Sequence, residues 1–129
     1  MLKAITTSTA TVSANGTVPI TLKYNTNGNT SLSNNIITIN RSGIYNINAV
    51  LNVTATATTT NIGLYANGTL IPETNTTITS VVGDEYQLVI NDIERVIRSL
   101  PVTQNVQLTI QTTTGATIDI ANVSLVEIR

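Results

Sequence analysis

The chain contains no cysteine and no histidine among its 129 residues. Without thiols it can form neither a disulfide framework nor a thiolate metal site, and without imidazole it lacks the commonest general base and the commonest transition-metal ligand. A serine or threonine nucleophile would have only Lys3 and Lys23 as basic partners, both in the N-terminal part. We therefore expect a protein that is not an enzyme and that binds no cofactor and no metal.

Charged and aromatic side chains are also scarce. Charged residues make up 10% of the chain, the formal net charge is -1, and phenylalanine and tryptophan are missing. Such a surface offers no basic stripe for a phosphate backbone and no stacking platform for bases. There is no run of about 18 apolar residues, and residues 1–10 lack the apolar segment of a secretory signal. We expect no nucleic-acid partner, no membrane partner, and synthesis in the cytoplasm.

Threonine, asparagine, isoleucine and valine dominate the chain. β-Branched residues favour the half-buried surface of a sheet, and asparagine and glycine supply turns. The length is usual for one domain, and no linker, charge block or repeat divides the chain. The composition predicts an all-β fold in a single domain, residues 1–129. Within it, we expect residues 1–35 to contain one or two edge strands followed by a loop at 25–35.

The segment from Ile36 to Ala55 has the clearest pattern. From Tyr45 to Ala55 the odd positions are apolar, whereas the even positions are mostly asparagine and threonine. This alternation is typical of a strand with one buried face. Because the segment is longer than the usual strand of about 5 to 6 residues, we expect a central strand of a sheet that packs face to face on another.

Further alternating segments are separated by turn residues. Asn67-Gly68 between two apolar runs is a strong hairpin signal. The apolar residues of the last segment are even-numbered at Ile118 and Ile120 but odd-numbered from Ala121 onward. This change in the alternation predicts a bulge near Ile120 or Ala121. The pattern predicts eight to ten strands in a sandwich or barrel. The expected strand regions are 17–24, 36–40, 43–55, 61–66, 69–72, 84–101, 106–110 and 117–129, with a strand end passing into a loop at 56–60 and a turn at 113–116.

Residues 84–101 leave two interpretations open. Tyr86, Leu88 and Ile90 alternate as in a strand, whereas Asn91 and Glu94 have the spacing of a capping box. The apolar residues that would share one helical face are Ile93, Val96, Ile97 and Leu100. The all-β context favours the strand, with a short helix over 91–100 as the alternative.

Asp84 and Glu85 follow Gly83 and could supply oxygen ligands to a hard cation such as Ca²⁺. A cation of this kind needs about 6 to 8 oxygen atoms, and the chain has no Asp-x-Asp spacing to supply them. We therefore expect these two residues to lie in a solvated loop.

Asp92 and Glu94 are spaced to lie on one face of a strand. Two carboxyls could share acid and base roles only if their surroundings separated their pKa values. We expect instead a solvated face on which they pair with Arg95 or Arg98.

Three stretches of the chain, in this order, are similar to segments of one known family. The stretch IITINRSGIYNINAVLNVTA, residues 36–55, is similar to the family segment in which Gly-x-Tyr opens a long inner strand. The stretch VIRSLPVTQNVQLTI, residues 96–110, resembles the family's late hairpin, with Gln104-Asn105 where Gly-Asp is often found. The chain then stops after ATIDIANVSLVEIR, as family members end on a core strand. The family is the trimeric jelly roll of tumour-necrosis-factor-like ligands and complement globular heads, which includes bacterial spore-surface and phage relatives.

The resemblance implies a two-sheet antiparallel jelly-roll sandwich that assembles as a homotrimer. It also implies that Tyr45 packs at or near the trimer axis, whereas the residues alone make Tyr45 an ordinary core aromatic. The aromatic residues that usually surround the axis are largely missing, which leaves Tyr45, Tyr65 and Tyr86 in this region. A closed trimer would also cover sheet edges that so few charges leave unprotected.

From these observations we expect a non-enzymatic structural or surface-display protein. The expected role is a homotrimeric bacteriophage capsid decoration or head-fibre protein, at the virion surface, with itself and with capsid or fibre proteins as partners. The alternative is a receptor- or glycan-binding module at the surface of a phage, a bacterial spore or a cell.

Overall fold

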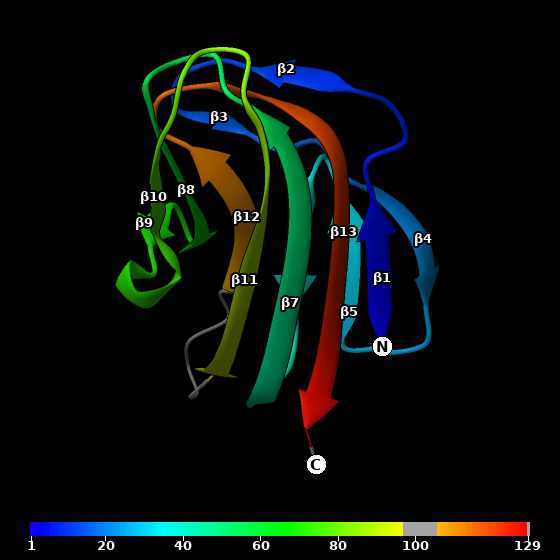
Figure 1. The fold of residues 1–129 in the computed structure, drawn as a ribbon. Coiled ribbons are helices and arrows are strands. Elements are labelled where there is room, and N and C mark those ends of the chain that lie inside the picture. The colour runs from blue at the N-terminus through cyan, green and yellow to red at the C-terminus, as the bar shows by residue number, and fades with distance from the viewer. Residues whose placement is uncertain (97–105, 129) are drawn as a thin grey trace.

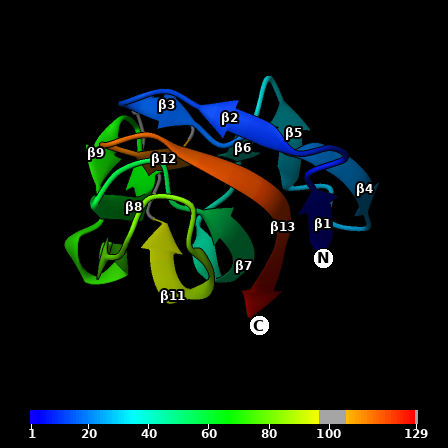
Figure 2. The ribbon, with the colours of Figure 1, turned by 45° about the horizontal axis from the view of Figure 1, so that its top comes forward.

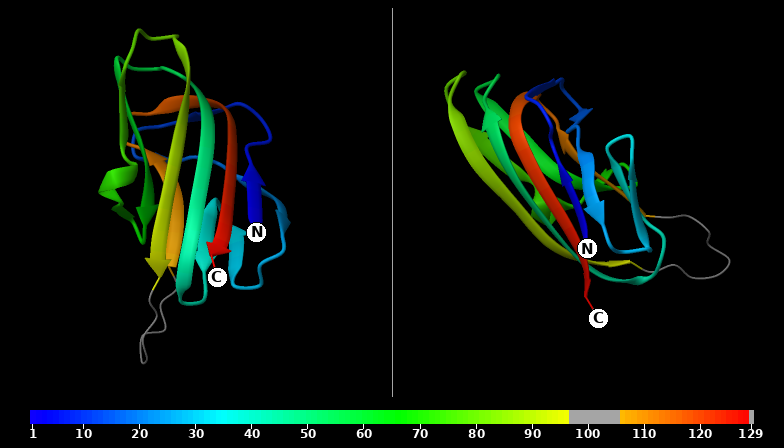
Figure 3. Two further views of the ribbon diagram at one scale, coloured as in Figure 1. Left: turned by 60° about the horizontal axis from the view of Figure 1, so that its bottom comes forward. Right: turned by 90° about the vertical axis from the view of Figure 1, so that its right-hand side faces the viewer.

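The computed structural model describes residues 1–96 and 106–128, which form two antiparallel β-sheets (Figure 1). The first sheet has the order β11-β7-β13-β1-β4, with β2 paired to β13. Its strands are β1 (Leu2–Ile5), β2 (Ala10–Val12), β4 (Thr21–Asn25), β7 (Gly43–Thr54), β11 (Glu85–Val96) and β13 (Ala116–Ile128). Seen edge-on, this sheet forms a layer of its own beside the second sheet (Figure 3).

The second sheet has the order β10-β8-β12-β6-β5, with β3 paired to β12 and β9 paired to β8. Its strands are β3 (Gly16–Thr17), β5 (Thr30–Ser33), β6 (Ile36–Ile39), β8 (Thr59–Ala66), β9 (Thr69–Leu70), β10 (Thr76–Thr79) and β12 (Val106–Thr112). A short 3₁₀ helix, η1 (Pro72–Thr74), connects β9 to β10. The expected all-β, two-sheet antiparallel sandwich is confirmed.

The core lies between the two sheets, and β7 contributes most regularly to it. The inward side chains of β7, none of which has any exposed area, are Tyr45, Ile47, Ala49, Leu51 and Val53. They belong to one buried cluster with side chains of the second sheet that include Ile39, Ile62, Leu64, Leu108 and Ile110. Burying one such aliphatic side chain contributes about 1.5 to 3 kcal/mol. The alternation predicted for this segment is confirmed, and β7 pairs with a neighbour on both sides.

The parity change in the last strand arises from a bulge. The register of β13 on β7 shifts between Ile118 and Ile120, so Asp119 is the extra residue. Ile118 and Ala121 both point into the core, whereas Ile120 is 50% exposed. The hydroxyl of Thr54 donates a 2.7 Å hydrogen bond to the Asp119 carboxylate across this irregularity. The predicted bulge is confirmed.

The strand interpretation of the segment that begins at Asp84 is confirmed as far as Val96. β11 pairs with β7 without interruption, from Glu85 opposite Thr54 to Val96 opposite Gly43. The alternative helix is wrong for residues 91–96, because pairing along the whole of β7 outweighs a local capping signal. Residues 97–105, which include the turn of the late hairpin, lie outside the described residues.

The N-terminal part holds more structure than the sequence indicated. The run 25–35, expected to be a loop, contains β5, which forms a hairpin with β6. Asn34 and Asn35 connect the two strands with φ values of 52° and 66°, a left-handed conformation that asparagine tolerates well. β1 is not an edge strand, because it lies between β13 and β4.

The strand number was also underestimated, since 13 strands are present in the ranges 1–96 and 106–128. The additional ones are short, and β2, β3 and β9 span only two or three residues each. Residues 10–17 pass from the first sheet to the second, because β2 pairs with β13 and β3 pairs with β12 (Figure 2). The termini of the described chain lie together at the opposite end of the long strands (Figure 1).

Candidate functional site

The outward face of β11, β7 and β13, called the outer face below, carries an unusual number of exposed apolar side chains. Eleven large apolar side chains are exposed in the described ranges, and six of them lie here. The six are Ile44, Val89, Ile93, Ile120, Val126 and Ile128. Exposed apolar residues are normal when scattered, but a contiguous patch marks an interaction surface.

Uncharged polar side chains fill most of the remaining positions of the outer face, and its charged residues Glu85 and Arg95 lie at the two ends of β11. In cross-strand register, Asn91 lies opposite Asn48, which lies opposite Ser124 on the other side. The other amides of the face are Asn46, Asn52, Gln87 and Asn122. Amides supply hydrogen bonds without the desolvation penalty of a charge. The middle of the outer face, between these two charged residues, is therefore suited to burial against another uncharged protein surface.

Tyr45, the residue proposed for a trimer axis, lies inside the sandwich. Its side chain has no exposed area, and its hydroxyl donates a 2.9 Å hydrogen bond to the carbonyl oxygen of Arg41. This placement is that of a core aromatic. Packing at an axis stays a prediction that no contact of the single chain tests. The surface at this point of β7 belongs to Ile44 and Asn46, which point outward.

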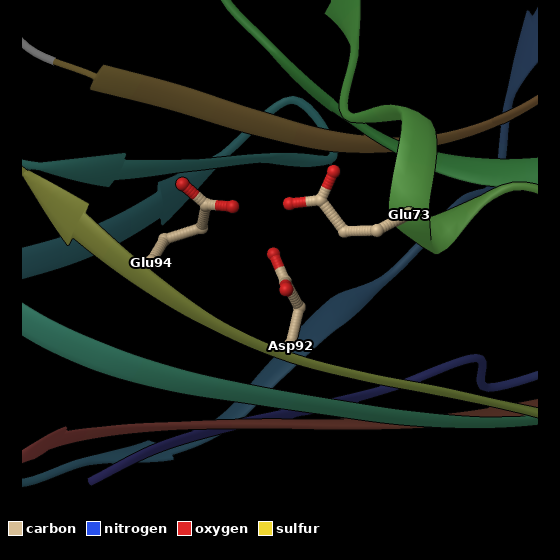
Figure 4. A group of neighbouring side chains, drawn as sticks. All are labelled: Glu73, Asp92 and Glu94. Carbon is tan, nitrogen blue, oxygen red and sulfur yellow. The ribbon is translucent and has the colours of Figure 1, made fainter.

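Three carboxylates meet at one edge of the sandwich. Glu73 on η1, Asp92 and Glu94 on β11 place one carboxylate oxygen each within 4.8 Å of one another (Figure 4). Asp92 and Glu94 are half-buried and continue the inward series that begins with Leu88 and Ile90. The expectation that the two residues share one face of a strand is confirmed.

The expected ion pairing of these carboxyls is wrong for Arg95. Strand alternation places Arg95 on the opposite side of β11 from Asp92 and Glu94. Arg98 lies outside the described residues. Glu73 was not predicted as their neighbour, because about twenty residues of chain separate it from Asp92 and only the tertiary fold brings η1 to β11.

The arrangement of the cluster perturbs the pKa of Glu94. A hydrogen bond with the Asp92 side chain, partial burial, and the negative charges of Asp92 and Glu73 together raise this pKa from 4.5 to about 7. The Oδ2 atom of Asp92 is shielded from solvent and has no hydrogen-bond partner. Glu94 therefore keeps its proton to a higher pH than an isolated glutamate does.

The overall arrangement matches solved structures, although no family model and no curated protein matches the sequence. The structure of Eiger TNF from S. frugiperda aligns with a TM-score of 0.74 and 10% identity, covering 99% of this chain and 92% of that one. A crystal structure of murine APRIL at pH 8.5 aligns with a TM-score of 0.66 and 10% identity, covering 95% of this chain and 94% of that one. The chain has the tumour-necrosis-factor-like jelly-roll fold. At this identity the likeness shows the fold alone, and at that level the resemblance inferred from the three stretches is confirmed.

At the end of the tumour-necrosis-factor-like jelly roll away from the termini, Asp84 closes a tight turn. Its carboxylate accepts a hydrogen bond from the amide of Val81 at 3.1 Å, and its own amide donates to the Val81 carbonyl at 3.0 Å. Asp84 and Glu85 are both exposed; Asp84 lies in the expected loop, whereas Glu85 is the first residue of β11 and pairs with Thr54. The carboxylate of Asp84 thus stabilises the turn by accepting this hydrogen bond from Val81.

A shallow hollow of about 360 Å³ lies near this end of the jelly roll. It is lined by Asn52, Val53, Glu85, Tyr86 and Asp119. Two of its polar side chains already accept hydrogen bonds within the chain. Gln87 donates to the Asn52 side chain at 3.2 Å, and Thr54 donates to the Asp119 carboxylate. The only helix in the described part of the chain, η1, is too short to cross a membrane.

Proposed function

We propose that this chain is a non-enzymatic structural or surface-display protein whose jelly roll assembles as a homotrimer through the outer face. The observation that carries the proposal is the combination on that face of six exposed apolar side chains with uncharged amides. Removing apolar surface from water contributes roughly 25 cal/mol per Å². The amides would hydrogen-bond across the same interface.

The register between β11, β7 and β13 arranges the outer-face side chains in rows across the three strands. Ile93, Asn46 and Val126 form one row across the three strands, and Arg95, Ile44 and Ile128 form the next. Apolar side chains therefore gather where β11 and β13 end and β7 begins. A patch of this kind buries itself fully when a small number of copies close around a symmetry axis.

The mass in solution tests the assembly. Multi-angle light scattering should give three times the chain mass of 13.7 kDa, independent of concentration in the micromolar range. A mass of 13.7 kDa at all accessible concentrations would overturn the proposed homotrimer.

More specifically, we propose a bacteriophage capsid decoration or head-fibre protein, made in the host cytoplasm and displayed on the virion surface. Two observations support this role: one apolar core lies between the sheets, and the chain has no cysteine and so no disulfide. Such a module can assemble in a reducing compartment. Negative-stain images of particles with and without this chain test the role, and identical particle surfaces would exclude it.

A second candidate is a receptor- or glycan-binding module at a phage, spore or cell surface, and the turn between β10 and β11 favours it. Val81 and Val82 are 71% and 59% exposed at its tip. The turn is held in place by hydrogen bonds from Gly83 to the Ala55 carbonyl and from the Ala55 amide to the Asp84 carbonyl, both 2.8 Å. A rigid exposed apolar tip loses little entropy on binding.

The binding role can be tested on intact bacterial cells. The wild-type protein should be retained, and the double variant Val81→Thr/Val82→Thr should not be. Threonine keeps the β-branched shape and replaces one methyl group of each valine by a hydroxyl, which is costly to bury in an apolar contact. Equal retention of both proteins, or retention of neither, would count against a receptor-binding tip.

A further inference from the structure

The three carboxylates lie where the two sheets meet at an open edge of the sandwich. β11 is the edge strand of the first sheet, and β10 is the edge strand of the second. η1 leads into β10 and contacts β11. Glu73 on η1 points toward Asp92 and Glu94 on β11 (Figure 4). The cluster is therefore a bridge between the edges of the two sheets.

No positive charge among the described groups neutralises this bridge. The charged groups that face Glu94 are Asp92 on its own strand and Glu73 on η1. Arg95 borders the hollow beside Glu94 but does not contribute to the Glu94 pKa. The other residues around that hollow are uncharged, namely Ala66, Asn67, Val96, Val106 and Leu108.

Three carboxylates at these distances cannot all be ionised without strong repulsion. One proton removes most of it, because a protonated carboxyl donates a hydrogen bond to an ionised neighbour. The hydrogen bond between Glu94 and Asp92 is the place for that proton. Its loss would leave like charges facing one another across the edge.

We propose that Glu73, Asp92 and Glu94 form a protonation-dependent clasp that holds η1 against β11 in mild acid and loosens this edge when its proton is lost. The clasp belongs to the fold of the single chain and does not depend on self-association.

The direction of the pH dependence follows from linkage. The folded state binds the Glu94 proton more tightly than the unfolded chain, because the folded pKa of about 7 exceeds the unfolded value of 4.5. The stabilisation is therefore complete below pH 4.5 and is lost as the pH rises through about 7. The chain has no histidine, the side-chain type that normally titrates between pH 5 and 7. A change in stability over this pH range can therefore be assigned to Glu94.

The contribution of the clasp to stability can be measured as the change in Tm between pH 5 and pH 7, in EDTA to remove divalent cations. We expect the wild-type Tm to fall by about 4 °C from pH 5 to pH 7. A fully buried carboxyl group would give a larger change, because solvent screens the interactions of the partly exposed Glu94. Glu94→Gln keeps a hydrogen-bond donor in place of the proton, so its Tm should stay nearly constant. Glu85→Gln, an exposed site at the other end of β11, is the matched control and should keep the wild-type slope.

Hydrogen exchange measures the opening of η1 itself, residue by residue. The amides of Thr74 and Asn75 close η1 by bonding to the carbonyls of Ile71 and Pro72. After correction for intrinsic rates, they should be less protected at pH 7 than at pH 5 in the wild type. In Glu94→Gln, protection should not change with pH. Equal Tm slopes in wild type and Glu94→Gln, or unchanged protection of η1 in the wild type, would overturn the clasp.

Discussion

Ile93 on β11 and Asn46 on β7 are register partners on the outer face, and Val126 on β13 is the partner of Asn46 on the other side. Ile93 is 61% exposed and Val126 is 39% exposed. The Oδ1 atom of Asn46, between them, is shielded from solvent and has no hydrogen-bond partner. A row of this composition is typical of an interface.

Ile93→Asp should convert the proposed trimer into single chains. It would place a carboxylate in each copy of the buried face, where an unpaired charge is strongly unfavourable. Light scattering would show the mass falling to 13.7 kDa, with the circular dichroism of the fold unchanged. Val82→Asp, at the exposed tip of the β10–β11 turn, is the control and should stay trimeric. An Ile93→Asp variant with the wild-type mass would place the interface elsewhere.

Tyr45→Phe should lower the free energy of unfolding by about 0.5 to 1.5 kcal/mol, because the Arg41 carbonyl loses its hydrogen-bond donor. Tyr45→Ala should cost about 3 to 5 kcal/mol, since it also leaves a cavity in the core. Urea denaturation measures both values. A change of oligomeric mass in Tyr45→Phe without loss of stability would contradict the core role and support one at the trimer axis.

Thr74→Val should destabilise the chain by about 1 to 3 kcal/mol. The buried hydroxyl of Thr74 accepts a 2.9 Å hydrogen bond from the Leu64 amide and donates a 2.7 Å hydrogen bond to the Ile71 carbonyl. Valine has the same shape but leaves the Leu64 amide without its side-chain acceptor. Thr74→Ser keeps the hydroxyl and should cost less than 1 kcal/mol. If serine and valine had equal effects in chemical denaturation, packing and not hydrogen bonding would hold η1 on β8.

Gly63→Ala should cost about 1 to 3 kcal/mol, because a Cβ atom at this site in β8 would lie 2.6 Å from Leu70 Cδ1 and 3.4 Å from Asn75 Cα. Leu70 could relieve part of the clash by turning its side chain. Gly28→Ala is the matched control, since nothing lies within 4 Å of its added Cβ atom, and it should be neutral or slightly stabilising. Thermal denaturation compares the two, and an equal Tm for both variants would contradict a close approach at Gly63.

Much of the sandwich could be predicted from local pattern. The alternation after Tyr45 predicted β7, and the parity change between Ile118 and Ala121 predicted the bulge at Asp119. β5 was missed because Thr30–Ser33 lies in a polar run, although Asn34 and Asn35 in the turn that follows were a usable signal. Edge strands of this kind bury few side chains, so their sequences carry little of the alternation that reveals an inner strand.

The acidic cluster could be predicted only in part. The spacing of Asp92 and Glu94 placed both on one face of a strand, but it did not show that this face turns inward at an open edge. Glu73 arrives from η1, and its position depends on the path of the chain between β9 and β10. The raised pKa of Glu94 depends on that convergence.

The amino-acid sequence by itself determined the β-class of this protein, the inward face of β7, and the absence of the thiol and imidazole chemistry on which many enzymes depend. These are properties of residue type and of a backbone whose side chains alternate every second residue. The tertiary structure alone decided that apolar residues of three strands form one outer face and that three carboxylates share one edge. Such neighbours are set by which strands pair, and pairing joins residues that are far apart in the chain.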